Sequence, residues 1–239
     1  MPYYFYGFDP TYLYIVLPCF ILAMLANARV NNTFRRYSKQ LSTRRITGRD
    51  AAMCVLMANG VHNVEIQRVS GKLTDHYDPK ANVIRLSESV YDSTSTAAIG
   101  VACHEAGHAL QYANDYSPIK IRAAIIPVTN IGSRLAMPLI LLGILFGSLG
   151  SGSYTLIYLG IACFALSLVF QLITLPVEFN ASRRAMEAIE NAEILTEEEQ
   201  RGARKTLTAA AMTYVAAVAI AAAQLLRLIL LFGGRRRND

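Results

Sequence analysis

Four apolar stretches, each able to form a membrane-spanning helix, limit what this chain can fold into more than any other feature. They cover residues 12–28, 135–149, 154–177 and 207–232. A helix needs about 20 apolar residues to cross the hydrocarbon core of a bilayer. The second stretch is short, and residues 121–131 before it are expected to form an interfacial helix broken at Pro127. Because 53% of the residues are hydrophobic, the chain is too apolar for an ordinary soluble domain.

The first apolar stretch is predicted to be a retained anchor. Residues 26–28 (Ala-Asn-Ala) are similar to a signal-peptidase site, but residues 1–11 contain no Lys or Arg. A cleaved signal peptide begins with a positively charged region, which is missing from this chain.

The distribution of basic residues predicts the orientation in the membrane. Seven Lys and Arg residues follow the first stretch between positions 29 and 49, and none precedes it. The positive-inside rule therefore places the N-terminus outside and the following region in the cytosol. The uncharged segment 147–153 is then an outer turn, and the basic residues of 178–206 return to the cytosol. Four crossings from an outer N-terminus would leave the basic tail, 233–239, outside, against the positive-inside rule. Either the fourth helix does not fully cross, or the earlier charges decide the orientation.

The net charge of +6 is not interpreted as a sign of nucleic-acid binding. The basic residues gather at the membrane ends, where anionic lipid headgroups attract them, and no platform of aromatic and basic residues accompanies them. The cysteines lack close pairing, which favours reduced thiols over a disulfide framework or a cysteine zinc cluster. They are Cys19, Cys54, Cys103 and Cys163.

Residues 29–134 are enough for a small folded core. A short helix is expected over 46–60, because Thr47 and Asp50 form a capping-box pattern and Gly60 is a natural stop. Residues 63–69 alternate apolar and polar side chains, as a strand does.

A hairpin is expected next, over residues 73–87, with its turn at Asp78-Pro79. Residues 93–115 predict a helix that begins at Ser or Thr caps. A further capped helix is expected to begin at Thr196.

The helix at 93–115 contains the pattern His-Glu-Ala-Gly-His at residues 104–108. Residues four apart leave the same face of an α-helix, so His104 and His108 can both reach one zinc ion. Glu105 lies about 100° round the helix, where it can act as general base on a zinc-activated water. The alternative is an ordinary helix with polar residues, but the apolar neighbours imply burial, and buried polar groups need partners. The pattern therefore predicts a zinc site.

A zinc site needs a third ligand from elsewhere in the chain. A histidine six residues past His108 would indicate a metzincin, but that position is Asn114. His62 and His76 are candidates, although each is more typical of a solvated or hydrogen-bonded strand residue. The best candidate is Glu178, which follows the third apolar stretch on the predicted cytosolic side.

The motifs "TDHYDP", "ACHEAGHALQ" and "EFNASRRA", together with the membrane hairpin, resemble the YugP-type family of membrane zinc metallopeptidases. The resemblance covers nearly the whole chain. It implies a zinc endopeptidase with one Zn²⁺ per chain, held by His104, His108 and Glu178, with Glu105 as catalytic base. It also implies a multi-pass protein of a bacterial plasma membrane, whose site faces the cytosol.

The layout is more distantly similar to HtpX-like gluzincins, in which an aspartate after the glutamate ligand supports a histidine. This chain has Ser182 at that position, so we expect Ser182 to take over the role, or else Asp75 or Asp78. Donors to the oxyanion of the transition state are less well defined, since three side chains qualify. They are His76, Arg183 and Arg184.

The expected fold class is a mainly α membrane protein, with about four transmembrane helices and a small α+β zincin-like catalytic domain in the cytosol. The expected parts are an anchor (1–28), the peptidase domain (29–134), a membrane hairpin (135–177), a helical segment with the third ligand (178–206) and a last membrane helix with the tail (207–239). The expected partners are the lipid bilayer and polypeptide substrates, membrane-associated or misfolded. The strand at 82–86 is expected to pair with an extended substrate through a free edge.

Two other functions remain open from the sequence. A site-2-type intramembrane protease requires an Asp ligand in a later span, within a segment similar to Leu-Asp-Gly, and the sequence contains no such segment. A membrane scaffold with structural zinc requires four protein ligands, whereas a catalytic zinc keeps one position for water.

Overall fold

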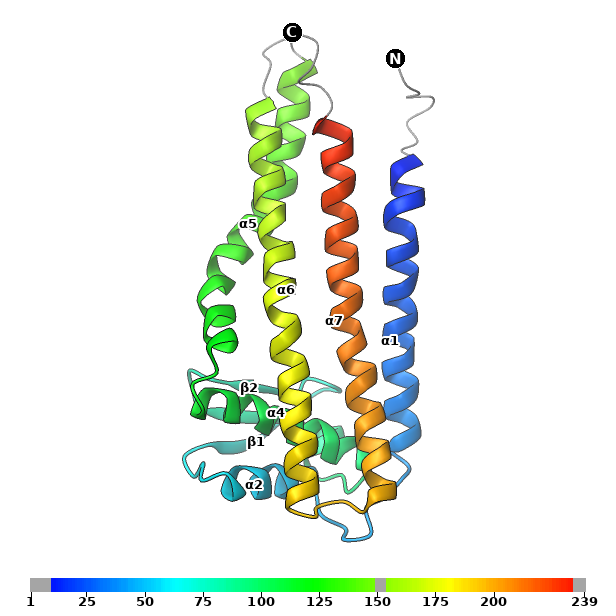
Figure 1. Ribbon diagram of the computed structural model, residues 1–239, viewed down its shortest axis with the longest axis vertical. Coiled ribbons are helices and arrows are strands. Elements are labelled where there is room, and N and C mark those ends of the chain that lie inside the picture. Colours follow the sequence, from blue (N-terminus) through cyan, green and yellow to red (C-terminus); the bar gives the residue numbers. More distant parts are fainter. Residues whose placement is uncertain (1–9, 149–153, 234–239) are drawn as a thin grey trace. The chain divides into compact units, whose positions relative to one another are not determined.

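The computed structural model describes residues 10–148 and 154–233 (Figure 1). The predicted turn lies largely outside these residues, as does all but the first residue of the basic tail. The chain divides into two compact units. The apolar unit comprises Met1–Leu25, Ile121–Thr174 and Tyr214–Asp239, and the mixed unit comprises Ala26–Lys120 and Leu175–Thr213.

Four helices in the described part of the chain are long and apolar enough to cross a membrane. They are α1 (Leu17–Tyr37), which a π-helical turn at Tyr12–Val16 precedes, α5 (Ser117–Ser148), α6 (Tyr154–Asn191) and α7 (Glu197–Phe232). In the apolar unit these helices expose large hydrophobic side chains, including Leu22, Ile131, Leu141 and Leu230. Extended apolar surface of this kind marks contact with a membrane or a partner. The predicted set of four apolar helices is confirmed.

The helices continue beyond the apolar stretches of the sequence. α6 extends past the end of the third stretch to Asn191, and α7 begins at Glu197, well before the fourth. The segments concerned are rich in Ala, Glu and Arg, which favour helix, so nothing ends the helix where the apolar sequence ends.

The predicted break at Pro127 is wrong, because α5 runs unbroken through Pro127 and Pro138. A proline removes one backbone hydrogen bond, and a helix continues when its other bonds and its packing hold the backbone.

Within the apolar unit, α5 and α6 approach closely at Gly160. A Cβ at this position would lie 2.7 Å from the carbonyl oxygen of Ala136 and 2.6 Å from the Ile140 side chain. Small residues allow membrane helices to pack at such short range.

In the mixed unit, α2 (Gly48–Ala58) forms as predicted. The Thr47 Oγ1 accepts a hydrogen bond from the backbone N–H of Asp50 and donates one to its carboxylate, which caps the first turn. Gly60, with φ +73°, follows the end of the helix in a conformation that glycine adopts without strain.

A three-stranded sheet follows, in the order β1-β3-β2, built from β1 (Glu65–Val69), β2 (His76–Asp78) and β3 (Val83–Ser87). β3 pairs parallel with β1 and antiparallel with β2, so the predicted strand and hairpin are confirmed. The prediction of a free edge on residues 82–86 is wrong, because β3 is the central strand. Short-range patterns define the hairpin, but the parallel pairing with β1 is non-local.

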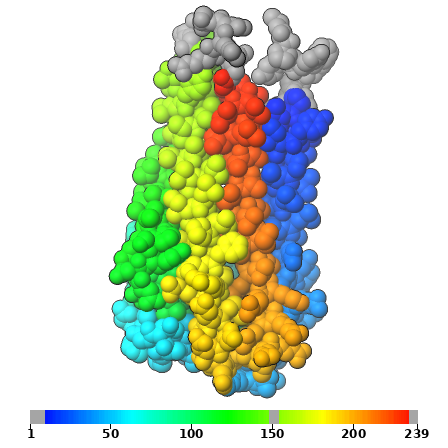
Figure 2. All heavy atoms as spheres, viewed as in Figure 1, coloured from blue at the N-terminus to red at the C-terminus, as the bar shows by residue number. Residues whose placement is uncertain are grey.

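After a short helix, α3 (Glu88–Tyr91), the central helix α4 (Thr96–Ala113) begins at Ser95, whose Oγ accepts a hydrogen bond from the backbone N–H of Ala98. α4 is almost entirely buried. It forms one hydrophobic core with α2, the sheet, the C-terminal part of α6 and the N-terminal part of α7. Figures 1 and 2 show that part of α6 (yellow) beside that part of α7 (orange). The capped start of α7 is also confirmed, since Thr196 and Glu199 exchange two hydrogen bonds.

Candidate metal centre

The two histidines of the motif lie on one face of α4, one turn apart. Their rings are 4.7 Å apart between centroids and nearly perpendicular. Both side chains are largely buried, so their polar nitrogens need partners within the protein.

Glu178 of α6 supplies the partner. Its Oε2 lies 3.3 Å from the Nε2 of His104 and 3.5 Å from the Nε2 of His108, and only 2% of the residue is exposed. Among the described residues, these three side chains form the one group that can hold a metal ion, with ligand atoms within 4.8 Å of one another.

The spacing of these atoms suits zinc. Ligand atoms about 2.0–2.1 Å from a tetrahedral zinc ion are about 3.3–3.4 Å from one another, close to the separations from Glu178 Oε2 to both imidazoles. Two imidazoles and one carboxylate are also a donor set that catalytic zinc sites use. The residues present therefore fit the metal.

A close approach of two helices allows the three ligands to meet. A Cβ on Gly107 would lie 2.6 Å from the backbone carbonyl oxygen of Ala181. No side chain fits there, so the glycine between the two histidines lets α4 pass directly against α6.

Each histidine has a partner on its other ring nitrogen. The Ser182 Oγ lies 3.1 Å from His104 Nδ1, and the Gln111 Oε1 lies 3.0 Å from His108 Nδ1. The sequence predicts a supporting role for Ser182 but none for Gln111. A signal for Gln111 does exist in the sequence, because it is a polar residue three positions after His108 on the buried face of the same helix.

Glu105 follows His104 and is 8% exposed. Its charge and that of Glu178 act on His108. Burial alone would lower the pKa of His108, but the hydrogen bond to Glu178 and the charges of both carboxylates raise it above its ordinary value. Two carboxylates, those of Glu105 and Glu178, therefore act electrostatically on one candidate ligand.

The other predicted residues pair with groups other than the three candidate ligands. His76 Nδ1 donates a hydrogen bond to the carbonyl of Thr74, Arg183 forms an exposed ion pair with Glu187, and Arg184 donates to Asn180. His62 and His76 are not in the metal-binding group.

Asp75 and Asp78 are the alternative candidates to support a ligand histidine. Among the described residues, neither forms a hydrogen bond with His104 or His108. Asp75 accepts hydrogen bonds from the backbone N–H and the hydroxyl of Ser87. Burial raises its pKa above the ordinary value, and the bonds from Ser87 counteract this. Asp78 pairs with Arg85 at 2.7 Å, so both aspartates stabilise the sheet.

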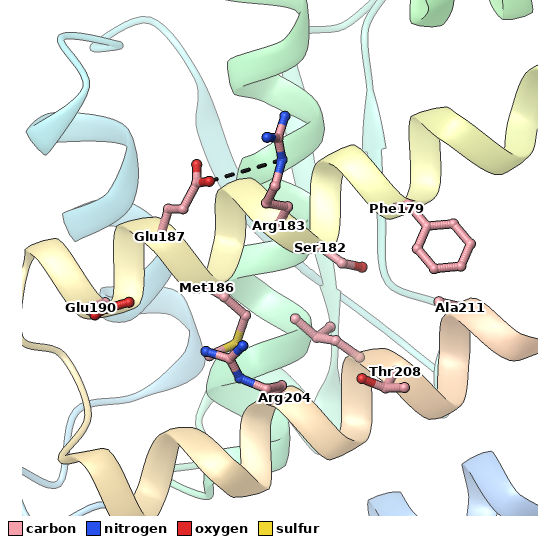
Figure 3. Close-up of a pocket in the computed structure, with 10 residues that line it drawn as sticks. Phe179, Ser182, Arg183, Met186, Glu187, Glu190, Arg204, Thr208 and Ala211 are labelled. Atoms are coloured by element: carbon pink, nitrogen blue, oxygen red, sulfur yellow. Dashed lines mark ion pairs between the residues drawn. The ribbon is translucent and has the colours of Figure 1, made fainter.

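A surface cavity of about 360 Å³ lies between α6 and α7 (Figure 3). Ser182, which contacts His104, also lines this cavity. Its apolar lining comes from Phe179, Met186, Leu207 and Ala211, and charged residues such as Arg204 and Glu190 border it.

Comparison with known proteins identifies the family. A family model described as "Putative neutral zinc metallopeptidase" matches residues 12–233, nearly the whole chain. The chain belongs to this family. It is also 44% identical, over 205 residues, to the "Putative membrane protease YugP" of Bacillus subtilis (strain 168). The match covers 86% of this chain and 89% of that relative, so the resemblance predicted from the motifs is confirmed. No solved structure matches the chain.

Proposed function

We propose that this chain is a membrane zinc metalloendopeptidase, with His104, His108 and Glu178 as ligands of one zinc ion and Glu105 as general base. The observation that carries the proposal is the convergence of two imidazole nitrogens on one carboxylate oxygen, at the spacing of zinc ligands. The family and the name of the relative support the same activity.

A zinc ion held by His104, His108 and Glu178 would supply a Lewis acid to polarise the peptide carbonyl and to lower the pKa of water towards about 7. Glu105 takes a proton from the attacking water and delivers it to the nitrogen of the leaving amine. A positioned general base contributes about 10²–10⁴-fold to the rate of such a reaction. The buried surroundings of Glu105 and His108 exclude bulk water from the reacting groups.

The two alternative functions fit the site less well. A structural zinc is closed by four protein ligands, and the group found among the described residues offers three. A site-2-type protease uses an aspartate as third ligand, and this position is Glu178. A zinc ion held by these three ligands would keep one position for water, which favours catalysis.

The substrate is proposed to be a polypeptide in extended conformation that pairs with β2, an edge of the sheet. β2 packs against the motif helix, where the rings of Tyr77 and Tyr112 lie 5.7 Å apart. The cavity between α6 and α7, with its apolar lining, is suited to one hydrophobic substrate side chain. Membrane-associated or misfolded proteins present such segments.

The cell membrane is the proposed location, with the mixed unit in the cytosol. The basic residues that follow the first apolar stretch support this orientation through the positive-inside rule. Four apolar helices and the membrane protease relative support insertion.

The test is the zinc content and peptide cleavage of the detergent-purified protein, before and after treatment with a chelator. About one zinc per chain, loss of cleavage on chelation and its recovery when zinc is restored are the expected results. A protein that holds zinc but cleaves none of a broad library of unfolded peptides would support the scaffold function.

A further inference from the structure

Gln111 is completely buried, and each of its polar atoms has a partner. Its Oε1 lies 3.0 Å from His108 Nδ1, and its Nε2 lies 2.8 Å from the carbonyl oxygen of Val177 and 3.0 Å from Asn180 Oδ1. One amide therefore joins a metal ligand on α4 to the residue that precedes Glu178 on α6.

Two groups that cannot change their roles fix the direction of these hydrogen bonds. The carbonyl of Val177 can only accept, so the amide of Gln111 must present its nitrogen to α6. The guanidinium of Arg184 can only donate, and its Nε lies 2.8 Å from Asn180 Oδ1, so this atom of Asn180 is the oxygen. Both ends of the chain of hydrogen bonds therefore turn the oxygen of Gln111 towards His108.

The orientation of Gln111 determines which nitrogen of His108 carries the proton. An amide oxygen only accepts, so Nδ1 of His108 must carry a hydrogen. In the metal-free protein Nε2 can also donate to Glu178, and a metal ion that replaced this second proton would bind the lone pair of Nε2. Nε2 is the atom that faces Glu178, 3.5 Å away. The ring is thus held in the tautomer that can bind a metal, and the bond from Nδ1 increases the basicity of the ligand.

We propose that Gln111 is a positioning residue of the metal centre, which fixes the tautomer and orientation of His108 and braces the backbone next to Glu178. Asn180 and Arg184 extend this function to the protein surface, where the guanidinium packs 5.9 Å from the ring centroid of Tyr116. The inference rests on the proposed function, because it assigns a role to residues around the proposed zinc ligands.

The test is the dissociation constant for Zn²⁺, measured by competition with a chromophoric chelator on the purified full chain. Gln111→Met removes both the acceptor and the donor, and Gln111→Glu keeps the acceptor for His108 but loses the donor to Val177. Loss of a group that orients a ligand typically weakens metal binding about 10–100-fold. We expect this loss for Gln111→Met, and zinc binding by Gln111→Glu that is closer to wild type than to Gln111→Met.

A matched control separates positioning from general loss of a polar contact. Gln200 also donates from Nε2 to a backbone carbonyl, that of Leu195, but does not touch the metal centre. Gln200→Met should bind zinc as wild type does. The unfolding temperatures of this variant and of both Gln111 variants can change without affecting the test. Zinc binding that is equal in Gln111→Met and Gln111→Glu, or equally weakened in Gln200→Met, would overturn the inference.

A second pair of variants covers the case in which the buried substitutions prevent folding. Arg184→Met removes the donor that holds Asn180 Oδ1, so the amide of Asn180 can rotate by 180° and zinc binding should weaken. Arg183 is the exposed neighbour of Arg184, and Arg183→Met should leave zinc binding unchanged. Equal zinc affinity in these two variants would contradict the proposed chain of hydrogen bonds. A wild-type protein that binds no zinc would instead overturn the proposed function itself.

Discussion

The Oγ of Ser182 lies 3.1 Å from Nδ1 of His104, although the two residues are 78 positions apart in the chain. Glu178 and Ser182 are one turn apart on α6, so a single helix supplies both a ligand oxygen and a partner for a ligand histidine. This arrangement makes the part of α6 that follows the predicted third span part of the proposed metal centre.

Ser182→Ala should weaken zinc binding, because His104 loses the partner that orients its ring. The expected increase in the dissociation constant is about tenfold or more. Ser182→Asp restores an acceptor, now charged, and should bind zinc at least as tightly as wild type. Equal affinities in wild type and Ser182→Ala, measured by chelator competition, would show that the contact does not support the ligand.

Gly107→Ala should separate α4 from α6. The new Cβ meets the backbone carbonyl of Ala181 at 2.6 Å, and a backbone atom cannot move aside as a flexible side chain can. Overpacking of this kind typically costs about 1–3 kcal/mol. The unfolding temperature should fall and zinc should be retained less well. Gly147→Ala, which meets nothing within 4 Å, is the control and should change neither property.

The pairing of Asp78 with Arg85 should make the stability of the mixed unit sensitive to acid. The hydrogen bond from Arg85 lowers the pKa of Asp78 to about 2, below its value of about 3.9 in an unfolded chain. The stabilisation is therefore complete above about pH 4 and is lost as the pH falls through about 2. In the zinc-free protein, Asp78→Asn should unfold at a lower temperature than wild type at pH 7. This difference should shrink at pH 2, and an unchanged difference would contradict the assignment.

Thr208→Trp should test the cavity between α6 and α7. Thr208 is exposed and lines this cavity, so a large side chain can fill it without disturbing the core. If a substrate side chain binds there, cleavage should fall while zinc content stays at the wild-type level. Met212→Trp places the same side chain on an exposed position of α7 outside the lining and should leave cleavage unchanged. Cleavage by Thr208→Trp at the wild-type rate would show that the cavity does not bind a substrate side chain.

Much of this site could be predicted because its signals are local. The spacing of His104 and His108 needs only the geometry of one helix, and the caps at Thr47 and Ser95 need only a few neighbouring residues. The sequence could not assign Gln111, since its role depends on the backbone of α6, 66 positions away at Val177.

The two wrong predictions, on the edge of β3 and on the break at Pro127, also concern features that depend on residues far apart or on a whole helix. The central position of β3 follows from a parallel pairing with β1, which the alternating pattern of each strand does not encode. The continuity of α5 at Pro127 depends on the rest of the helix, whereas the sequence indicates only the local cost of a proline.

The central claim is that Glu105 is the base of a zinc-dependent hydrolysis, and Glu105→Gln tests it most directly. Glutamine has nearly the same size but cannot accept the proton from water, while His104, His108 and Glu178 remain intact. Zinc content and cleavage should therefore be measured together on the wild type and Glu105→Gln. The account predicts about one zinc per chain in both proteins and a loss of cleavage of about 10²-fold or more in the variant. A variant that keeps its zinc and cleaves at the wild-type rate would contradict it.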